Sequence, residues 1–295
     1  MAAEVTAKIV ALIESGVTPW ACPWDRSGLG AMPLRSTGQQ YQGINTLILW
    51  AEAAEKGYAA KHWFTYKQAA ELGGQVRAGQ KATTVVYYGS GESKTKTKAD
   101  GTAERFTFLK AYHVFNADQC DGLPAKFRPD FKPAAPRTWA DIADLDAWHA
   151  GTGIKTNHGG ARAFYRPSDD SVTMPERERF ADVADYYGTL FHEDVHATGA
   201  SHRVGRPRLT LKFGDMAYAI EELVAELGAA FLSAHFGLAS EPRADHAAYL
   251  ASWLGVLKSD PRALFLAAAE AQKAVNWLTK RGEVADVDEA LDVAA

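Results

Sequence analysis

The sequence predicts an α+β protein of two domains: an N-terminal α/β domain and a mainly helical C-terminal domain with a small sheet. A β-branched and aromatic run at residues 83–88 is typical of a strand and lies in the first half. Long segments of helical apolar periodicity, such as residues 217–236, dominate the second half. Between the halves, residues 129–136 contain three prolines, which remove backbone donors and hold the chain extended.

These observations set the expected domain boundaries. We expect a first domain at residues 1–130, a Pro-rich linker at 131–137, a second domain at 138–285 and an acidic tail at 286–295. A chain of 295 residues with 47% hydrophobic and 23% charged residues is typical of a soluble globular protein. Neither a signal-peptide core nor a stretch of membrane-spanning length is present, which favours a cytoplasmic protein that does not bind membranes.

Charge and cysteine content narrow the kinds of partner and metal site. Residues 1–130 carry 15 Lys and Arg against 12 Asp and Glu, whereas residues 131–295 carry 17 against 24. The net charges of the two halves therefore differ in sign, which suggests that the halves have different partners. The net charge of +3 in the first half is only suggestive of nucleic-acid binding. Cys22 and Cys120 lack metal-type spacing, so an intracellular metal would need histidine and carboxylate ligands.

In the first half we predict three helices and a hairpin. Apolar periodicity, and glycines that end helices, predict helices at residues 5–14, 45–55 and 67–72. The run at residues 83–88 and the aromatic segment 105–115 are predicted to be strands that pair around a charged loop, residues 94–104.

In the second half we predict helices around a small sheet. The predicted helices cover residues 139–150, 180–199, 217–236, 245–258 and 262–280. Short strands are predicted at residues 161–165 and 171–174, around the turn Pro167-Ser168-Asp169-Asp170. The second of these strands is a candidate edge for hydrogen bonding to a peptide.

The most informative motif is His192-Glu193-Asp194-Val195-His196, inside the predicted helix 180–199. Residues four apart lie on one face of a helix, so His192 and His196 can direct two imidazoles at one ion. A catalytic zinc has three protein ligands and one open position for water, and Glu193 is placed to take a proton from that water. The motif predicts a zinc hydrolase site, and a helix that carries two histidines without a metal is the alternative.

Two residues are candidates for the third ligand. Glu222 and Glu226 lie one turn apart on a face of helix 217–236 that also carries Ala229 and Ser233, small residues that allow close helix packing. Glu222 would then ligate the metal, while Glu226 would orient a ligating histidine. His202 is the alternative, because residues 192–202 fit the longer motif with a third histidine, which also requires a Met-turn.

Several stretches resemble the ArdC family of antirestriction proteins carried by conjugative plasmids. They are residues 41–50, 63–69, 71–81 and 114–116, and, in the second half, 186–187 with the motif, 221–232, 245–250 and 271–274. The resemblance implies an N-terminal single-stranded-DNA-binding domain and a C-terminal zincin-like metallopeptidase domain. It also implies Glu222 as third ligand, with Glu226 in the following acidic position. Asp194 replaces an apolar residue of the family, and His202 stands where serine is usual.

Single-stranded DNA is bound by aromatic side chains on which bases stack, within a basic groove. The first half offers candidates for both kinds of contact, and the lysines of loop 94–104 add positive charge. We predict DNA contacts from Arg35, Tyr41, Trp63, Lys67, Arg77 and Lys81. Many of the other aromatic residues must instead form the core.

The sequence therefore favours a bacterial cytoplasmic protein that binds single-stranded DNA and protects incoming plasmid DNA during conjugation. Its second domain would use Zn²⁺, or another divalent ion such as Mn²⁺, to cleave an unknown protein near that DNA. Glu193 would act as general base and then acid, and Tyr187 or Tyr218 would stabilise the oxyanion. One alternative is a DNA-coating protein whose metal site is structural or dispensable, and another is a metalloprotease whose N-terminal domain binds protein.

Overall fold

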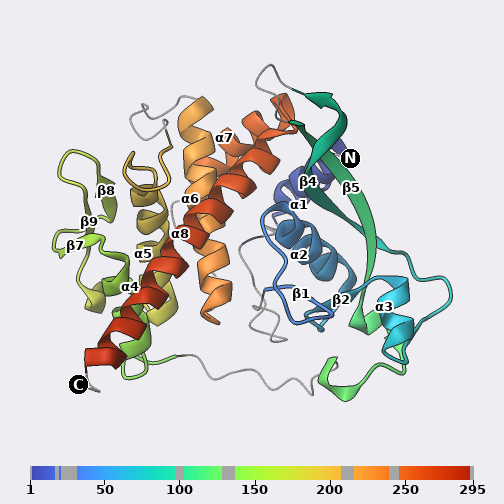
Figure 1. The fold of residues 1–295 in the computed structure, drawn as a ribbon. Helices are drawn as coiled ribbons and strands as arrows, with labels where there is room; N and C mark the ends of the chain where they lie inside the picture. Colours follow the sequence, from blue (N-terminus) through green and yellow to red (C-terminus); the bar gives the residue numbers. More distant parts are fainter. Residues whose placement is uncertain are drawn as a thin grey trace. The chain divides into compact units, whose positions relative to one another are not determined.

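The chain divides into two compact units (Figure 1). The computed structural model describes residues 2–16, 20, 32–97, 103–127, 137–206, 216–238 and 246–292. We call residues 33–41 and 45–130 the sheet unit, and residues 1–32, 42–44 and 131–295 the helical unit. The α+β fold class predicted from the sequence is confirmed.

The sheet unit is built on a four-stranded sheet of order β1-β2-β5-β4. Its strands are β1 (Leu34–Arg35), β2 (His62–Phe64), β4 (Thr83–Thr97) and β5 (Ala103–Asn116). β1 and β2 are parallel, whereas β5 runs antiparallel to both β2 and β4. The predicted hairpin is therefore present, and its strands reach further into the segment 94–104 than the predicted loop allowed.

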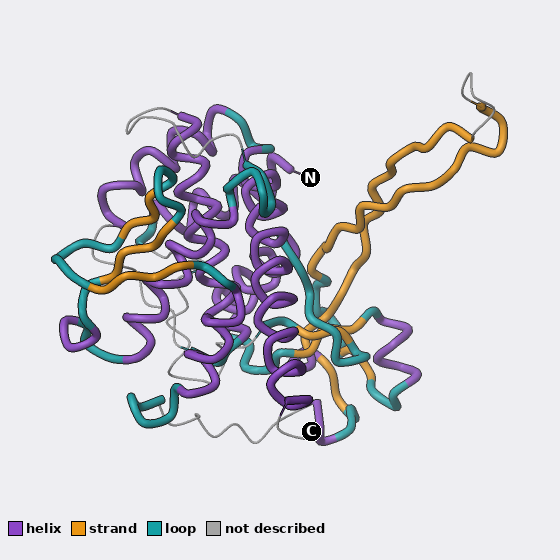
Figure 2. Tube along the Cα trace, turned by 60° about the vertical axis from the view of Figure 1, so that its left-hand side comes forward, coloured by secondary structure: helices purple, strands orange, loops and turns teal. Residues whose placement is uncertain are grey.

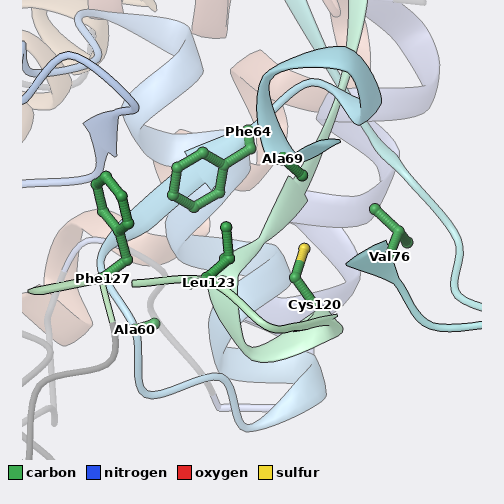
Figure 3. Packing of buried hydrophobic residues seen from close by; sticks show 8 residues of the cluster. Ala60, Phe64, Ala69, Val76, Cys120, Leu123 and Phe127 are labelled. Carbon is green, nitrogen blue, oxygen red and sulfur yellow. The ribbon is translucent and has the colours of Figure 1, made fainter. Parts of the chain in front are cut away.

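Two apolar clusters stabilise this sheet. Helix α2 (Ile44–Lys56) contributes Leu49 and Ala53 to one cluster, where they pack with Trp63, Val85 and Val114. The second cluster lies beside helix α3 (Tyr66–Glu71) and the strand pair β3 (Gln75–Val76) and β6 (Cys120–Asp121). Figure 3 shows its members, which are Ala60, Phe64, Ala69, Val76, Ala117, Cys120, Leu123 and Phe127. Short 3-10 turns cover Ala117–Gln119 and Ala125–Phe127.

The helical unit contains the long helices of the second half and the first helix of the chain. The helices are α1 (Ala2–Glu14), α4 (Ala143–Thr152), α5 (Val183–Thr198), α6 (Met216–His235), α7 (His246–Ser259) and α8 (Ala263–Asp292). Helix α6 packs against α5, α7 and α8, and α8 also packs against α4 (Figure 1). No helix in the described part of the chain is both long and apolar enough to cross a membrane.

A three-stranded sheet of order β7-β9-β8 completes this unit. β7 (Lys155–His158) is parallel to β9 (Ser171–Met174), and β8 (Phe164–Arg166) is antiparallel to it. The sequence prediction missed β7, and its proposal of residues 171–174 as an edge strand is wrong, because β9 is the central strand. A 3-10 turn, Arg177–Arg179, precedes α5.

The first residues of the chain are grouped differently from the predicted domain 1–130, because residues 1–32 belong to the helical unit. α1 packs against α7, and the Thr6 hydroxyl donates a hydrogen bond to the carbonyl oxygen of Pro261 at 2.7 Å. Trp20 is fully buried, with its ring edge-on to Trp253 at 6.0 Å. These contacts hold α1 and Trp20 in the helical unit.

Two further predicted boundaries concern the linker and the C-terminal tail. Residues 131–136 of the predicted linker lie outside the described residues. The predicted acidic tail, residues 286–295, continues α8 as far as Asp292. The acidic composition of that segment does not end the helix, because no proline or further glycine follows Gly282.

Candidate metal centre

Helix α5 carries the His-Glu motif in a buried position. It begins after Asp182, whose carboxylate accepts a hydrogen bond from the backbone N–H of Asp185 at 2.9 Å and so caps the helix. Every residue from Thr189 to Val195 is buried. A solvated surface helix would not bury two carboxylates and a histidine, so this burial favours a shared polar site.

Glycine at position 228 allows α6 to approach α5 closely. A Cβ atom at Gly228 would lie 2.6 Å from Cγ2 of Val195, which is too close for two carbon atoms. From the sequence we expected Ala229 and Ser233 to allow the close approach, whereas the contact with Val195 is made at Gly228. Consequently the carboxylates of Glu222 and Glu226 reach the histidines of α5.

The three predicted ligands converge on one point. The Nε2 atoms of His192 and His196 are 3.1 Å apart. Glu222 places Oε1 at 3.4 Å from Nε2 of His196 and Oε2 at 3.6 Å from Nε2 of His192. Ligand atoms bound to one tetrahedral zinc at ~2.05 Å are roughly 3.3 Å apart, so this donor set fits a divalent ion in both chemistry and spacing.

The pKa values of His196 and Glu222 are shifted by their mutual contacts and by burial. Burial alone would lower the pKa of His196, but hydrogen bonds to Glu221 and Glu222 raise it to about 10. Burial would raise the pKa of Glu222, and the two imidazoles outweigh this effect and hold it below its usual range. Metal binding at this site would therefore release a proton from an imidazole.

The remaining imidazole nitrogens face two more carboxylates of α6. Nδ1 of His192 lies 3.6 Å from Oε2 of Glu226, which is within ion-pair distance but too long for a hydrogen bond. Nδ1 of His196 lies 3.4 Å from Oε1 of Glu221, a residue that the sequence analysis did not single out. Such carboxylates fix the tautomer and direction of a ligating histidine.

Glu221 is itself held by Arg206, which the sequence analysis also missed. Nε of Arg206 lies 3.1 and 3.0 Å from the two carboxylate oxygens of Glu221. The guanidinium also donates to the Thr198 hydroxyl at 2.7 Å and to the Val195 carbonyl at 2.5 Å. Arg206 thereby connects the end of α5 to α6. Its role was not predictable from local sequence, because Arg206 and Glu221 are distant along the chain.

The candidate general base, Glu193, is positioned by the edge strand β8. The backbone N–H of Tyr165 donates a hydrogen bond to Oε2 of Glu193 at 2.8 Å. This N–H points away from β9, because residues facing each other across β8 and β9 alternate in their hydrogen bonding. In the described part of the chain β8 is an edge strand, so its outer edge, rather than β9, lies beside the motif.

The unusual aspartate of the motif has a structural partner. Asp194 is completely buried, and its Oδ2 lies 2.9 Å from Nδ1 of His149 on α4. Nε2 of His149 lies 2.8 Å from the hydroxyl of Thr156 on β7. Asp194 therefore connects α5 to α4 and, through His149, to the sheet, which explains why this position need not be apolar.

Two predicted residues do not reach the centre. Nε2 of His202 lies 3.2 Å from Oδ2 of Asp170, and the His202 side chain is 59% exposed, so the alternative third ligand is contradicted by its position. The Tyr187 hydroxyl donates to Oδ1 of Asp146 at 2.6 Å, which removes Tyr187 as an oxyanion donor. Tyr218, the other candidate oxyanion donor, lies half-buried on α6, and its role stays a prediction.

The predicted DNA contacts divide into buried and exposed residues. Tyr41 is 7% exposed and Trp63 is 2% exposed, so the prediction that bases stack on these rings is wrong. Both belong to the apolar cluster beside α2, because β2 is an interior strand of the sheet. Arg35, Lys67 and Lys81 are exposed.

Arg77 is also exposed, but its guanidinium already has acceptors. It lies 3.3 Å from Oδ1 of Asp121 and donates to the Asp118 carbonyl at 2.5 Å. Arg77 is therefore a weaker candidate for phosphate contact than Arg35 and Lys81. Lys67 also has a carboxylate partner, Glu71, at 3.6 Å.

Comparison with known proteins identifies both halves of the chain. Residues 1–115 match the model for the N-terminal domain of anti-restriction factor ArdC, and residues 143–270 match a zincin-like metallopeptidase family. The chain is 40% identical to protein y4eC of Sinorhizobium fredii, over 93% of this chain and 90% of that protein. It is 37% identical to the DNA primase TraC of Escherichia coli over 92% of its own length, but spans only 26% of TraC.

Solved structures agree with these matches. The metal-free crystal structure of the antirestriction protein ArdC from plasmid R388 superposes with a TM-score of 0.82, at 43% sequence identity, covering 96% of this chain and 98% of that one. The Mn(II)-bound structure of the same protein, at the same identity and coverage, gives a TM-score of 0.77. Together with the zincin-like domain and the converging ligands, these similarities show that the chain belongs to the ArdC family of antirestriction proteins.

Proposed function

We propose that this protein binds single-stranded DNA and protects incoming plasmid DNA from restriction in the bacterial cytoplasm, and that its helical unit is a metal-dependent peptidase. The observation that carries the peptidase proposal is the convergence of His192, His196 and Glu222 beside the buried Glu193. The DNA proposal is supported by the ArdC family match and by the similarity to part of a DNA primase.

In this proposal, His192, His196 and Glu222 hold Zn²⁺, and the Mn(II)-bound ArdC structure makes Mn²⁺ a second candidate. A bound ion of this kind polarises the scissile carbonyl and lowers the pKa of an attacking water. Glu226 and Glu221 orient the two imidazoles from their Nδ1 sides.

Glu193 carries the proton in the proposed reaction. Its carboxylate takes a proton from the attacking water and later gives that proton to the leaving amine. The Tyr165 N–H keeps one carboxylate oxygen in place, so the other is available to the water. A substrate peptide lies along the outer edge of β8, where the Tyr165 N–H already donates to Glu193, and this brings the peptide's carbonyl beside Glu193.

The peptidase half is tested with the variant Glu193→Gln in a conjugation assay that compares plasmid transfer into restricting and non-restricting recipients. Glutamine has the same size and can still accept from Tyr165, but it cannot accept a proton from water. General acid–base groups contribute about 10²- to 10⁴-fold in rate, so protection should be lost while metal content, checked by mass spectrometry, is retained. His202→Ala is the matched control and should protect fully.

Full protection by Glu193→Gln would instead support the second candidate function, a DNA-coating protein whose metal site is structural or dispensable. One observation favours that candidate. Arg206 binds both Glu221 of α6 and Thr198 of α5, so the groups around the metal ligands also connect these two helices, as a structural site would.

The DNA half is tested by a gel-shift titration of the full chain on a single-stranded oligonucleotide over a salt series. The full chain is needed because residues 1–32 pack in the helical unit, so a 1–130 fragment would divide that unit. Phosphate contacts predict affinity that falls steeply with salt. Absence of a shift at low salt would instead favour a sheet unit that binds protein.

A further inference from the structure

The exposed aromatic residues of the sheet unit differ from those that the sequence suggested. Among the residues of this unit whose side chains the structure describes, the large apolar ones that lie exposed are Tyr66, Tyr87 and Tyr112. Tyr87 is 50% and Tyr112 is 44% exposed, and their ring centroids are 6.5 Å apart at an angle of 79°. These two rings form an exposed pair.

The register of the hairpin places this pair on one face of the sheet. Val85 lies directly opposite Tyr112, and Tyr87 lies directly opposite Lys110. Opposed residues project to the same face, as do residues two apart on one strand. Tyr87, Tyr112 and Lys110 therefore continue the face whose inner part, Val85 and Val114, is buried in the cluster with α2.

Tyr66 lies on the opposite face. Its ring contacts Phe115 at 6.3 Å, and Phe115 directly follows Val114, so it projects to the other side of β5. Phe115 packs against the cluster shown in Figure 3, which is separate from the one beside α2. Tyr66 thus provides an exposed tyrosine in the same unit but away from the pair.

The strands that carry the pair form a two-stranded ribbon. β2 pairs with β5 only at Phe115 and Asn116, so from Val114 outward the described part of β5 is paired with β4 alone. Figure 2 shows β4 and β5 as a long ribbon of strand. Residues 83–116 contain five Lys and Arg against three Asp and Glu, which favours a negatively charged ligand.

An exposed aromatic pair next to lysine is the chemistry of single-strand binding. Unpaired bases stack on aromatic rings whatever their sequence, while cations contact the phosphates. In a duplex the bases already stack on one another, so such a pair favours single strands.

We propose that Tyr87 and Tyr112 are the stacking site for single-stranded DNA, with Lys110 directed toward the phosphate backbone. This proposal rests on the proposed function and replaces the buried rings of Tyr41 and Trp63. The two rings are nearly perpendicular, at 79°, which suits one base stacked on a ring rather than a base inserted between the two rings.

The test measures binding of a fluorescein-labelled 30-nucleotide oligo(dT) to the full-length protein by anisotropy. The double variant Tyr87→Ala with Tyr112→Ala should bind about 10- to 100-fold more weakly, as expected from the loss of base–aromatic stacking. The double phenylalanine variant keeps both rings and should bind within about twofold of the wild type. Tyr66→Ala, the matched control on the other face, should also bind normally.

A second measurement does not depend on folding of the variants. Wild-type protein is cross-linked by ultraviolet light to an oligonucleotide that contains 5-iododeoxyuridine, and tryptic peptides are identified by mass spectrometry. Adducts on residues 82–94 or 111–126, assigned to Tyr87 or Tyr112, are the expected result.

The outcomes separate this proposal from the function on which it rests. If wild-type protein binds oligo(dT) and the folded double alanine variant binds equally well, or if adducts map only elsewhere, the stacking site is wrong and DNA binding stands. If wild-type protein does not bind oligo(dT) at low salt, the proposed DNA-binding function itself is wrong, and with it the stacking site.

Discussion

The metal centre and the ribbon of β4 and β5 differ in what fixes their chemistry. At the metal centre, His192, Glu193 and Glu222 are buried, and their positions follow from helix periodicity and close helix packing. On the ribbon, Tyr87 and Tyr112 are exposed, because they lie beyond the residues of the same face that pack in the cluster with α2. The comparison teaches that local spacing predicts the first kind of site, whereas long-range packing decides the second.

The largest effect is expected from Glu222→Ala, which removes one of three ligands from a buried site. We expect metal affinity to fall by more than about 100-fold, beyond the roughly 10- to 100-fold typical of residues that only orient a ligand. Competition with a chromophoric chelator measures this affinity. His202→Ala is the control, and an equal loss in that variant would contradict the assignment of Glu222.

A smaller loss of metal affinity is expected from Glu221→Gln. This variant keeps a side chain of similar size beside Arg206 but removes the charge that faces Nδ1 of His196. We expect affinity to fall about 10-fold, at the low end of such effects. Glu270→Gln, at a partly exposed carboxylate paired with Lys273, should leave affinity unchanged. Equal affinities in both variants would show that Glu221 does not orient His196.

The sequence predicted these two regions unequally, for physical reasons. Spacing on a helix placed His192 and His196 together. The two-faced pattern of helix 217–236 made Glu222 a candidate ligand, and the family resemblance favoured it over His202. Arg206 and Gly228 were missed, since they act through contacts with residues distant in sequence. No local pattern shows that β2 is interior, so Trp63 was expected to be accessible and is buried.

The close approach of α5 and α6 can be tested for its effect on stability. In Gly228→Ala, the new Cβ would overlap Val195, and overpacking of this kind costs about 1–3 kcal/mol of unfolding free energy. Gly188→Ala on α5 is the control, because no atom lies within 4 Å of its added Cβ, and it should gain up to ~1 kcal/mol. Adding Val195→Ala to Gly228→Ala should restore stability, and urea unfolding in the presence of chelator measures all three. A lack of restoration would place the strain elsewhere.

The smallest effect concerns pH and the pair of His149 and Asp194. Burial alone would lower the pKa of His149, but the Asp194 carboxylate raises it above its ordinary value of 6.5. Since the folded-state pKa is raised, the pair stabilises the protein fully below pH 6.5 and less as pH rises through the folded-state value. The melting-temperature difference between wild type and Asp194→Asn, in chelator, should therefore shrink from pH 5.5 to 8.5. A difference that grows with pH would contradict this assignment.

The central claim is that one divalent ion is shared by His192, His196 and Glu222. The most direct measurement is an anomalous-difference map, recorded at the zinc absorption edge from crystals of the full-length protein grown with zinc. We predict a single strong peak within bonding distance of both Nε2 atoms and of the Glu222 carboxylate. A peak at His202 and Asp170 instead, or no peak between the two imidazoles, would contradict the account.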